Sequence, residues 1–154
     1  MPVWQSIYEE LKDKNFEIIS AAQDTGGEAA AGKILDDAGV TYTAIIDDKH
    51  TISSLYNLVN VPSAVWIDEE GRIVRINEGT YAKGHKLGSF EFGSDDYVPA
   101  LRDWVENGKE SRYVWSAEKV ASKIRRRSSD EALSEPTFKL ATYYYQHDDM
   151  ERAN

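Results

Sequence analysis

The feature that most restricts the fold is a pair of short apolar runs joined by a tight turn and preceded by a proline. The runs are Ser63–Ile67 and Arg72–Ile76, and the loop between them is Asp68–Gly71. Strand-forming runs separated by a short glycine-containing loop are typical of a β-hairpin. Proline is tolerated at the start of a strand. We therefore expect an antiparallel pair of strands directly after Val61 and Pro62.

The segments before this hairpin alternate between helical and strand-like patterns. Apolar residues at helical spacing predict helices over residues 1–14 and 27–38 and around residues 52–59. Residues 16–22 and 40–46 are short, mostly apolar runs that predict buried strands. The order helix, strand, helix, strand, helix, hairpin predicts an α/β fold.

The helix over residues 27–38 has recognisable signals at both ends. Thr25 and Glu28 have the spacing of a capping box, in which each side chain bonds a backbone amide of the first turn. Gly39 stands where a left-handed residue ends a helix. The free amides at this helix start could instead bind a small anion. Because Glu28 can bond these amides, capping is the favoured interpretation.

The second half of the chain has a different character. Residues 77–94 are rich in glycine, lysine, serine and aromatic residues without a period, which predicts a surface loop or lid. Beyond it, Ser94 can cap a helix that ends at Gly108, and Ser116 can cap a second helix. A third helix is predicted over residues 135–147.

The segment Leu58–Val74 resembles the part of the thioredoxin fold in which a helix ends, a cis-proline loop follows and a hairpin begins. The resemblance is to the TlpA/ResA-like (redoxin, AhpC/TSA-like) family. It implies that Pro62 is cis and that the backbone of Val61 pairs with the substrate chain, so these two residues form the expected substrate groove. A trans proline that simply starts a strand is the alternative.

The N-terminal helix and residues 15–24 resemble the elements that follow the Trp-Cys-x-x-Cys motif in the same family. The resemblance implies an α/β, thioredoxin-like three-layer α/β/α fold that lacks its N-terminal central strand and is followed by a helical C-terminal extension. Residues 16–22 and 63–67 are then expected to have open edges. Three explanations are open: a fragment, which we favour, direct closure of the two strands, or a strand from another chain.

These interpretations divide the chain into three parts. Residues 1–81 are the expected thioredoxin-like core, residues 82–94 a loop or lid, and residues 95–154 a helical extension. Within the extension, the pattern from Leu140 to Ala153 resembles the first half of a tetratricopeptide (TPR) repeat. An ordinary amphipathic helix is the alternative interpretation.

Composition restricts the chemistry. The chain has no cysteine, which removes disulfide exchange, thiolate metal sites and cysteine nucleophiles. His50, His85 and His147 lie far apart in sequence, so we expect no metal site. No phosphate-binding, nucleotide-binding or serine-nucleophile motif is present, and we therefore predict no catalytic residue and no cofactor in this chain.

Charge and hydropathy restrict the partners. The formal net charge of −9 makes nucleic acid and anionic lipid unfavourable partners, and the basic run at residues 123–127 is better explained as a helix end. The N-terminus has no signal pattern and no apolar run is long enough to span a bilayer, so we expect a soluble chain of unassigned compartment.

Two functions follow from the sequence. The first is a thioredoxin-like domain of the thiol-disulfide oxidoreductase family that is redox-inactive because it has no cysteine. The alternative is a non-catalytic protein-interaction module, with a homodimer formed by strand addition as one form of it. The expected partner is a protein or peptide at the loop that contains Val61 and Pro62, and for the interaction module the helices are the other possible surface.

Overall fold

The computed structural model describes residues 2–79, 85–87, 90–92, 96–124 and 128–153. These residues form two compact units, which divide between Lys123 and Ile124.

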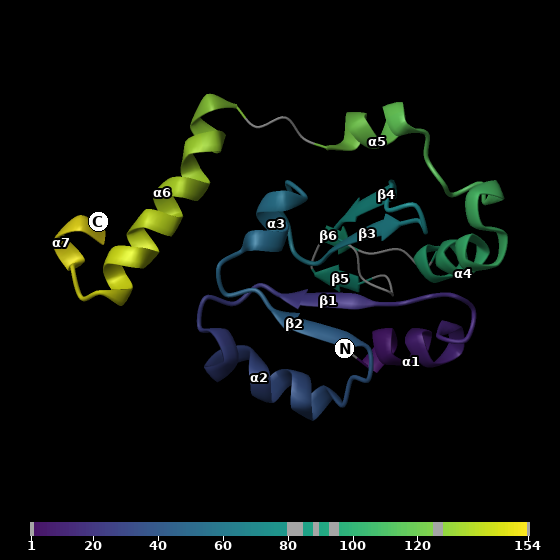
Figure 1. Ribbon diagram of the computed structural model, residues 1–154, viewed down its shortest axis with the longest axis horizontal. Helices are drawn as coiled ribbons and strands as arrows, with labels where there is room; N and C mark the ends of the chain where they lie inside the picture. The colour runs from purple at the N-terminus through teal and green to yellow at the C-terminus, as the bar shows by residue number, and fades with distance from the viewer. Residues whose placement is uncertain (1, 80–84, 88–89, 93–95, 125–127, 154) are drawn as a thin grey trace. The chain divides into compact units, whose positions relative to one another are not determined.

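The first unit is a mixed α/β structure (Figure 1). Its order of helices and strands agrees with the predicted order as far as the hairpin, but β1 and β2 begin later than predicted and α3 ends at Leu55. The elements in chain order are α1 (Pro2–Leu11), β1 (Ile19–Ala22), α2 (Gly27–Ala38), β2 (Thr43–Ile46), α3 (Thr51–Leu55), β3 (Ser63–Ile67), β4 (Ile73–Glu78), β5 (His85–Leu87), β6 (Phe90–Phe92), α4 (Tyr97–Asn107), a 3-10 turn (Gly108–Glu110) and α5 (Ala117–Lys123).

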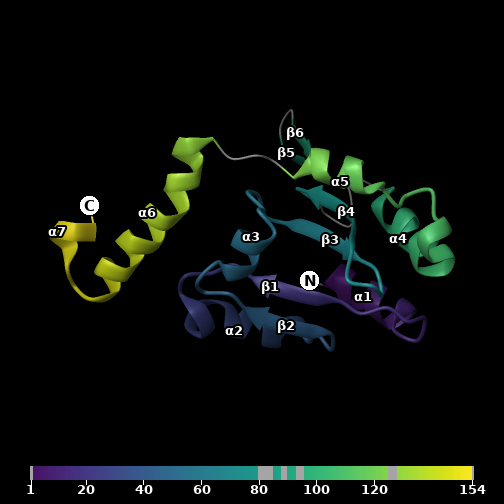
Figure 2. The ribbon, with the colours of Figure 1, turned by 45° about the horizontal axis from the view of Figure 1, so that its top comes forward.

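The strands of the described residues form three separate pairs. Strands β1 and β2 are parallel, with Ile19 opposite Thr43, whereas β3 and β4 are antiparallel, which confirms the predicted hairpin. Strands β5 and β6 form a second antiparallel pair. Figure 2 shows β1–β2 and β3–β4 as neighbouring ribbons. The structure therefore shows small sheets in an α/β unit, and the three-layer thioredoxin-like arrangement stays a prediction.

The hydrophobic core joins α1, the β3–β4 hairpin and α4. Leu11 is its most buried side chain, at 1% exposed. The indole of Trp66 stacks on that of Trp104 with ring centroids 4.9 Å apart, and its Nε1 donates to the Tyr97 hydroxyl at 2.7 Å. Burial raises the pKa of Tyr97 to about 12. The buried members of this core are Ile7, Leu11, Trp66, Val74, Tyr97, Ala100 and Leu101.

Arg75 lies opposite Trp66 in the hairpin. Its guanidinium carbon is 5.1 Å from the ring centroid of Trp66 and 4.9 Å from that of Trp115. Its Nε donates to Asn77 Oδ1 at 2.7 Å, and Nη1 donates to the Tyr113 carbonyl at 3.1 Å. Aromatic faces attract a cation through their quadrupole, so these rings compensate for the partial burial that lowers the pKa of Arg75.

Helix α1 also contacts the segment that leads into β2. The Gln5 side chain accepts a hydrogen bond from the Thr41 amide at 2.8 Å and donates one to Thr41 Oγ1 at 2.8 Å. The rings of Tyr8 and Tyr42 meet edge to face at 5.8 Å. One helix therefore packs against the β3–β4 hairpin and holds the start of β2.

The ends of α2 confirm one capping prediction and correct another. Gly39 ends the helix in the left-handed conformation, with φ of 56°, as predicted. The predicted capping box of Thr25 and Glu28 is wrong, because the N-cap is Gly26 and no side chain caps the helix. Instead, Asp24 Oδ1 accepts a hydrogen bond from the Gly26 amide at 2.8 Å and so forms the turn that precedes the helix.

The region after the hairpin differs from the expected loop and extension. The β5–β6 pair lies within the predicted loop 82–94, and the rest of that loop, including the predicted cap Ser94, is outside the described residues. Helix α4 belongs to the first unit because Ala100 and Leu101 are buried in its core. The sequence assigned these residues to the helical extension.

The second unit contains α6 (Ser129–Gln146) and α7 (Met150–Ala153). Helix α6 begins before the predicted start at residue 135, and Pro136 lies inside it. The guanidinium of Arg152 on α7 lies 5.7 Å from the ring centroid of Tyr144 on α6. The TPR-like interpretation stays a prediction.

The burial of Leu11 predicts a large effect of its truncation on stability. Truncating Leu11→Ala removes apolar contacts at a site that is 1% exposed, so we expect the free energy of unfolding to fall by about 2–5 kcal/mol. Leu55→Ala is the matched control, because Leu55 is 78% exposed and the same truncation there costs at most about 0.5 kcal/mol. Urea unfolding followed by circular dichroism measures both. Equal losses would contradict the assigned core.

Candidate functional site

The candidate site is the loop between α3 and β3, which contains Val61 and Pro62. The Val61–Pro62 peptide bond is cis. The Val61 side chain is 71% exposed, whereas Pro62 is partly buried and is followed at once by the first residue of β3. The loop therefore presents Val61 to solvent beside the start of a strand.

Short-range hydrogen bonds hold this loop. The Leu58 amide donates to the Ser53 carbonyl at 2.8 Å, which joins the start of the loop to α3. Ser63 Oγ donates to the Asn60 carbonyl at 2.6 Å, and Asn60 Nδ2 donates to Glu78 Oε2 at 3.1 Å. These contacts tie both sides of Val61 to the hairpin and to α3.

Asp47 positions the helix that leads into the loop. It is 8% exposed and follows β2 directly. Its carboxylate accepts hydrogen bonds from the amides of Thr51 at 2.8 Å and Ile52 at 2.7 Å, which are the first donors of α3. It also accepts one from Gln23 Nε2 at 2.8 Å, at the end of β1. One buried carboxylate thus connects β1, β2 and α3.

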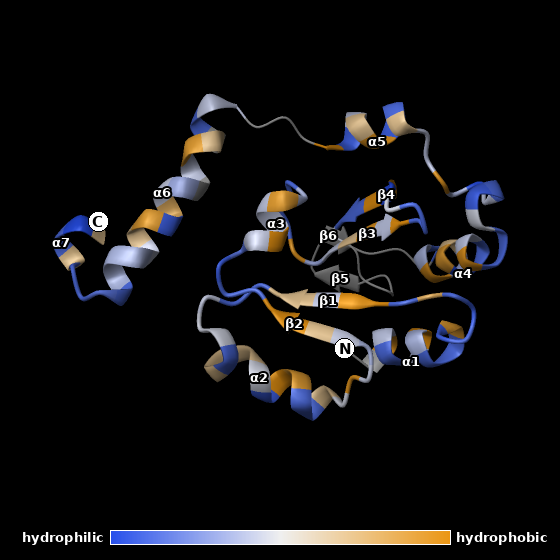
Figure 3. Cartoon of the chain, in the orientation of Figure 1, coloured by the Kyte–Doolittle hydropathy of each residue, from blue (hydrophilic) through white to orange (hydrophobic). Residues whose placement is uncertain are grey.

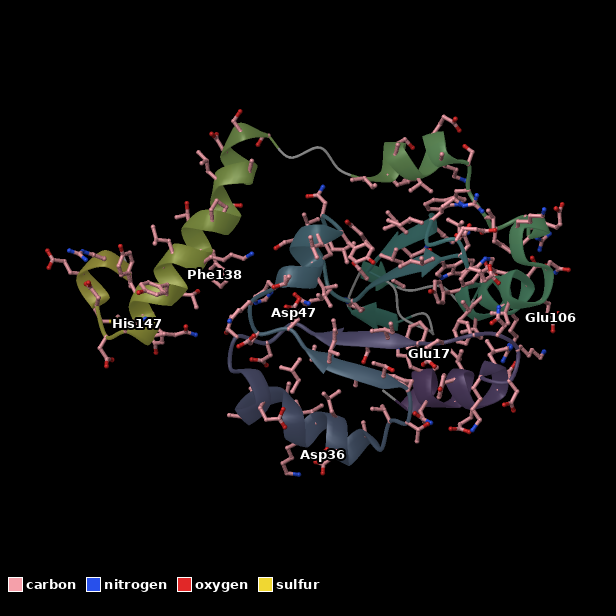
Figure 4. The ribbon with its side chains drawn as sticks, in the orientation of Figure 1. Glu17, Asp36, Asp47, Glu106, Phe138 and His147 are labelled. Carbon is pink, nitrogen blue, oxygen red and sulfur yellow. The ribbon has the colours of Figure 1, made fainter. Side chains whose placement is uncertain are left out.

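The electrostatics of Asp47 follow from these bonds. Burial acts to raise the pKa of its carboxyl, but the hydrogen bonds from Gln23, Ile52 and Thr51 outweigh burial. The net result is a pKa below the ordinary value of 3.8, so Asp47 is ionised at neutral pH. Figure 4 labels Asp47 close to α3 and the carboxyl ends of β1 and β2.

The end of α3 and the loop that follows it carry exposed apolar side chains. Leu55 is 78% exposed and Val59 is 43% exposed, and both precede Val61 by a few residues. Figure 3 shows hydrophobic residues on α3. We call Leu55, Val59 and Val61 the loop patch. An apolar patch beside a strand end is suited to contact with another polypeptide rather than to covalent chemistry.

The described part of the chain offers neither a thiol nor a cluster of metal ligands. The full sequence has no cysteine, so no Cys-x-x-Cys motif faces Pro62. Among the described residues, no group of three or more histidine or acidic side chains is arranged to hold a metal ion. Within the same residues, every helix is too short or too polar to cross a bilayer.

A groove with a volume of about 540 Å³ lies between α2 and β2, away from the loop. Gly32 and Leu35 of α2 and Tyr42 and Ile46 at β2 are among the residues that line it. Neither Val61 nor Pro62 lines this groove.

Comparison with known proteins gives a partial similarity. The chain is 29% identical over 79 residues to the thiol-disulfide oxidoreductase ResA of Oceanobacillus iheyensis and 28% identical over 79 residues to that of Halalkalibacterium halodurans. The matched part is 51% of this chain but only 41% and 44% of those two proteins. The chain therefore spans less than half the length of these relatives. No protein-family model matches the chain.

The similarity to ResA is distant. It supports a thioredoxin-like, TlpA-like domain in a chain that has no redox-active Cys-x-x-Cys. The sequence did not predict the structural role of Asp47, because an aspartate directly after a strand is also typical of an ordinary turn. Its burial and its reach to Gln23 become visible only once β1 and β2 are paired.

The Asp47 network makes a prediction about pH. The Asp47→Asn substitution replaces an acceptor oxygen by a donor, so we expect a loss of about 1–2 kcal/mol of stability at pH 7. Because the pKa of Asp47 is lowered by folding, its contribution is present above pH 3.8 and is lost as the pH falls through the lowered value. The difference between the variant and the original chain should therefore shrink as the pH is lowered from 7 to below 3.8.

The exposed neighbour Asp48 provides the control. Asp48→Asn should change the urea midpoint little at either pH. If both variants lose the same stability, or if the Asp47→Asn loss stays constant down to acid pH, the network does not act as described.

Proposed function

We propose that this chain is a TlpA/ResA-like thioredoxin-type domain that performs no thiol chemistry of its own and binds an extended protein segment at the loop patch. The observation that carries the proposal is the 79-residue similarity to ResA in a chain without cysteine. Thiolate is the nucleophile of disulfide exchange, so residues 1–154 can contribute recognition but not electron transfer.

Several features of the loop support recognition of a polypeptide. Val61 is exposed two residues before the start of β3, where a bound chain can reach backbone groups as well as the side chain. Leu55 and Val59, the other members of the loop patch, are also exposed and apolar. A thioredoxin-like groove that binds substrate chains beside a cis-proline is what the resemblance implies for Val61 and Pro62. A homodimer formed by strand addition stays a prediction, which sedimentation velocity measures directly.

Binding of an unfolded polypeptide tests the proposal. The probe is fluorescein-labelled insulin B chain whose cysteines are blocked by carbamidomethylation, and fluorescence anisotropy measures its Kd. Val61→Asp places a charge in the middle of the loop patch, so we expect the Kd to rise about tenfold.

Ile34→Asp is the matched control, because Ile34 is 62% exposed on α2 and the substitution changes the charge by the same amount. It should leave the Kd within about twofold. Absence of binding by the original chain, or an equal effect of the two variants, would count against the loop patch as the binding site.

A further inference from the structure

The groove between α2 and β2 has the dimensions of a small-molecule site. Its volume of about 540 Å³ lies within the range of about 300–1,000 Å³ that is usual for ligand pockets. Figures 1 and 2 both show α2 alongside β2, and the groove is lined by residues of these two elements and of the segment that joins them. It therefore belongs to the first unit alone.

The wall of the groove on the side of β2 is apolar. Tyr42, Ala44 and Ile46 alternate along the chain, so their side chains lie on one face of the strand, and all three line the groove. Tyr42 is 5% exposed, and its ring meets that of Tyr8 edge to face. Leu35 of α2 is half-buried and also lines the groove. These side chains can cover the apolar part of a ligand.

Two carboxylates lie beside this apolar wall. Glu28, Gly32 and Asp36 are spaced by four residues, so they follow one another along one face of α2, and all three line the groove. Figure 4 labels Asp36 on α2. Neither Glu28 nor Asp36 forms a side-chain hydrogen bond or an ion pair with another described residue. Both carboxylates are therefore free to bind a group that enters the groove.

Gly32 leaves room for one of these carboxylates. A Cβ atom at this position would lie 2.4 Å from Oε1 and 2.9 Å from Cδ of Glu28. The Glu28 side chain therefore lies over the backbone of Gly32, which is buried. Glycine in the middle of a helix is destabilising relative to alanine. The close approach of the Glu28 carboxylate gives this glycine a structural reason.

The charges around the groove favour a cation. Among the described residues that line it, none is lysine, arginine or histidine. Lys33 on α2 forms an ion pair with Asp37, and Lys49 follows Asp48 in the turn after β2. The segment from residue 24 to residue 49 contains six acidic side chains and these two lysines. The excess of negative charge attracts a cation and repels an anion.

We infer that the groove between α2 and β2 binds a small organic cation, an amine attached to an apolar body. The apolar body lies against Tyr42 and Ile46, and the ammonium group donates hydrogen bonds to the carboxylate of Glu28. The inference goes beyond the proposed function, because it uses neither the loop patch nor the similarity to ResA.

Titration with a simple amine tests the inference. The probe is 2-phenylethylamine, added to the ¹⁵N-labelled full chain and followed by nuclear magnetic resonance. A ligand of this size should bind with a Kd of about 1–10 mM. The chemical shift changes should be largest at the amides that line the groove, such as those of Gly32, Gly39 and Ala44.

Two analogues separate the contribution of charge from that of the ring. The alcohol 2-phenylethanol and the carboxylate 3-phenylpropanoate have the same ring but no positive charge. Both should bind at least about fivefold more weakly than the amine, and this preference should decrease with added salt.

Three variants locate the cation. Glu28→Gln keeps the size of the side chain and removes its charge, so the Kd of the amine should rise about fivefold. Asp13→Asn is the matched control, because Asp13 is exposed and does not line the groove, and it should leave the Kd within about twofold. Gly32→Ala displaces the Glu28 carboxylate, so the Kd should rise about threefold. The urea midpoint of Gly32→Ala should not fall, since alanine favours the helix, and this separates loss of the site from loss of the fold.

Several results would overturn the inference. They are equal affinity for the amine and the alcohol, shift changes outside the groove, and equal effects of Glu28→Gln and Asp13→Asn. Loss of insulin B-chain binding in Val61→Asp with an unchanged Kd for the amine would support separate sites. Absence of insulin B-chain binding by the original chain, with amine binding as described, would reject the proposed function alone.

Discussion

The packing of α1 is the contact on which the first unit depends. One face of this helix buries Ile7 and Leu11 against Trp66 of the hairpin, and its polar flank holds Thr41 ahead of β2 through Gln5. No described strand joins the β1–β2 pair to the β3–β4 pair, so backbone hydrogen bonds between strands do not fix the position of one pair relative to the other. A helix that contacts both sides supplies that constraint by side-chain packing, which is sensitive to single methylene groups.

Asp47 plays a comparable part at the other end of the strands. Its carboxylate accepts hydrogen bonds from the first amides of α3 and from Gln23, so it links the end of β1, the end of β2 and the start of α3. The loop with Val61 and Pro62 is then a short continuation of a fixed helix. Exposed apolar side chains can be presented on such a loop without losing their position.

Much of the local structure was predictable from the sequence. The β3–β4 hairpin and the left-handed Gly39 follow from turn chemistry, which acts over a few residues. Two other outcomes were not predicted, one of them local and one between distant segments. At the start of α2, Asp24 rather than Thr25 bonds the backbone, at the Gly26 amide. Helix α4 belongs to the core because its apolar stripe packs with residues of α1. The role of Asp47 required the pairing of β1 with β2.

The distribution of tryptophan gives the first unit an optical asymmetry. Trp66 and Trp104 stack on each other, Trp115 lies against Arg75, and Trp4 meets Tyr97, so all four indoles of the chain report on the hairpin side. The segment from β1 to β2 contains none. Intrinsic emission therefore monitors one side of the molecule, while far-ultraviolet ellipticity averages over both. Agreement or divergence of the two signals during denaturation reveals whether the halves melt as a single cooperative body.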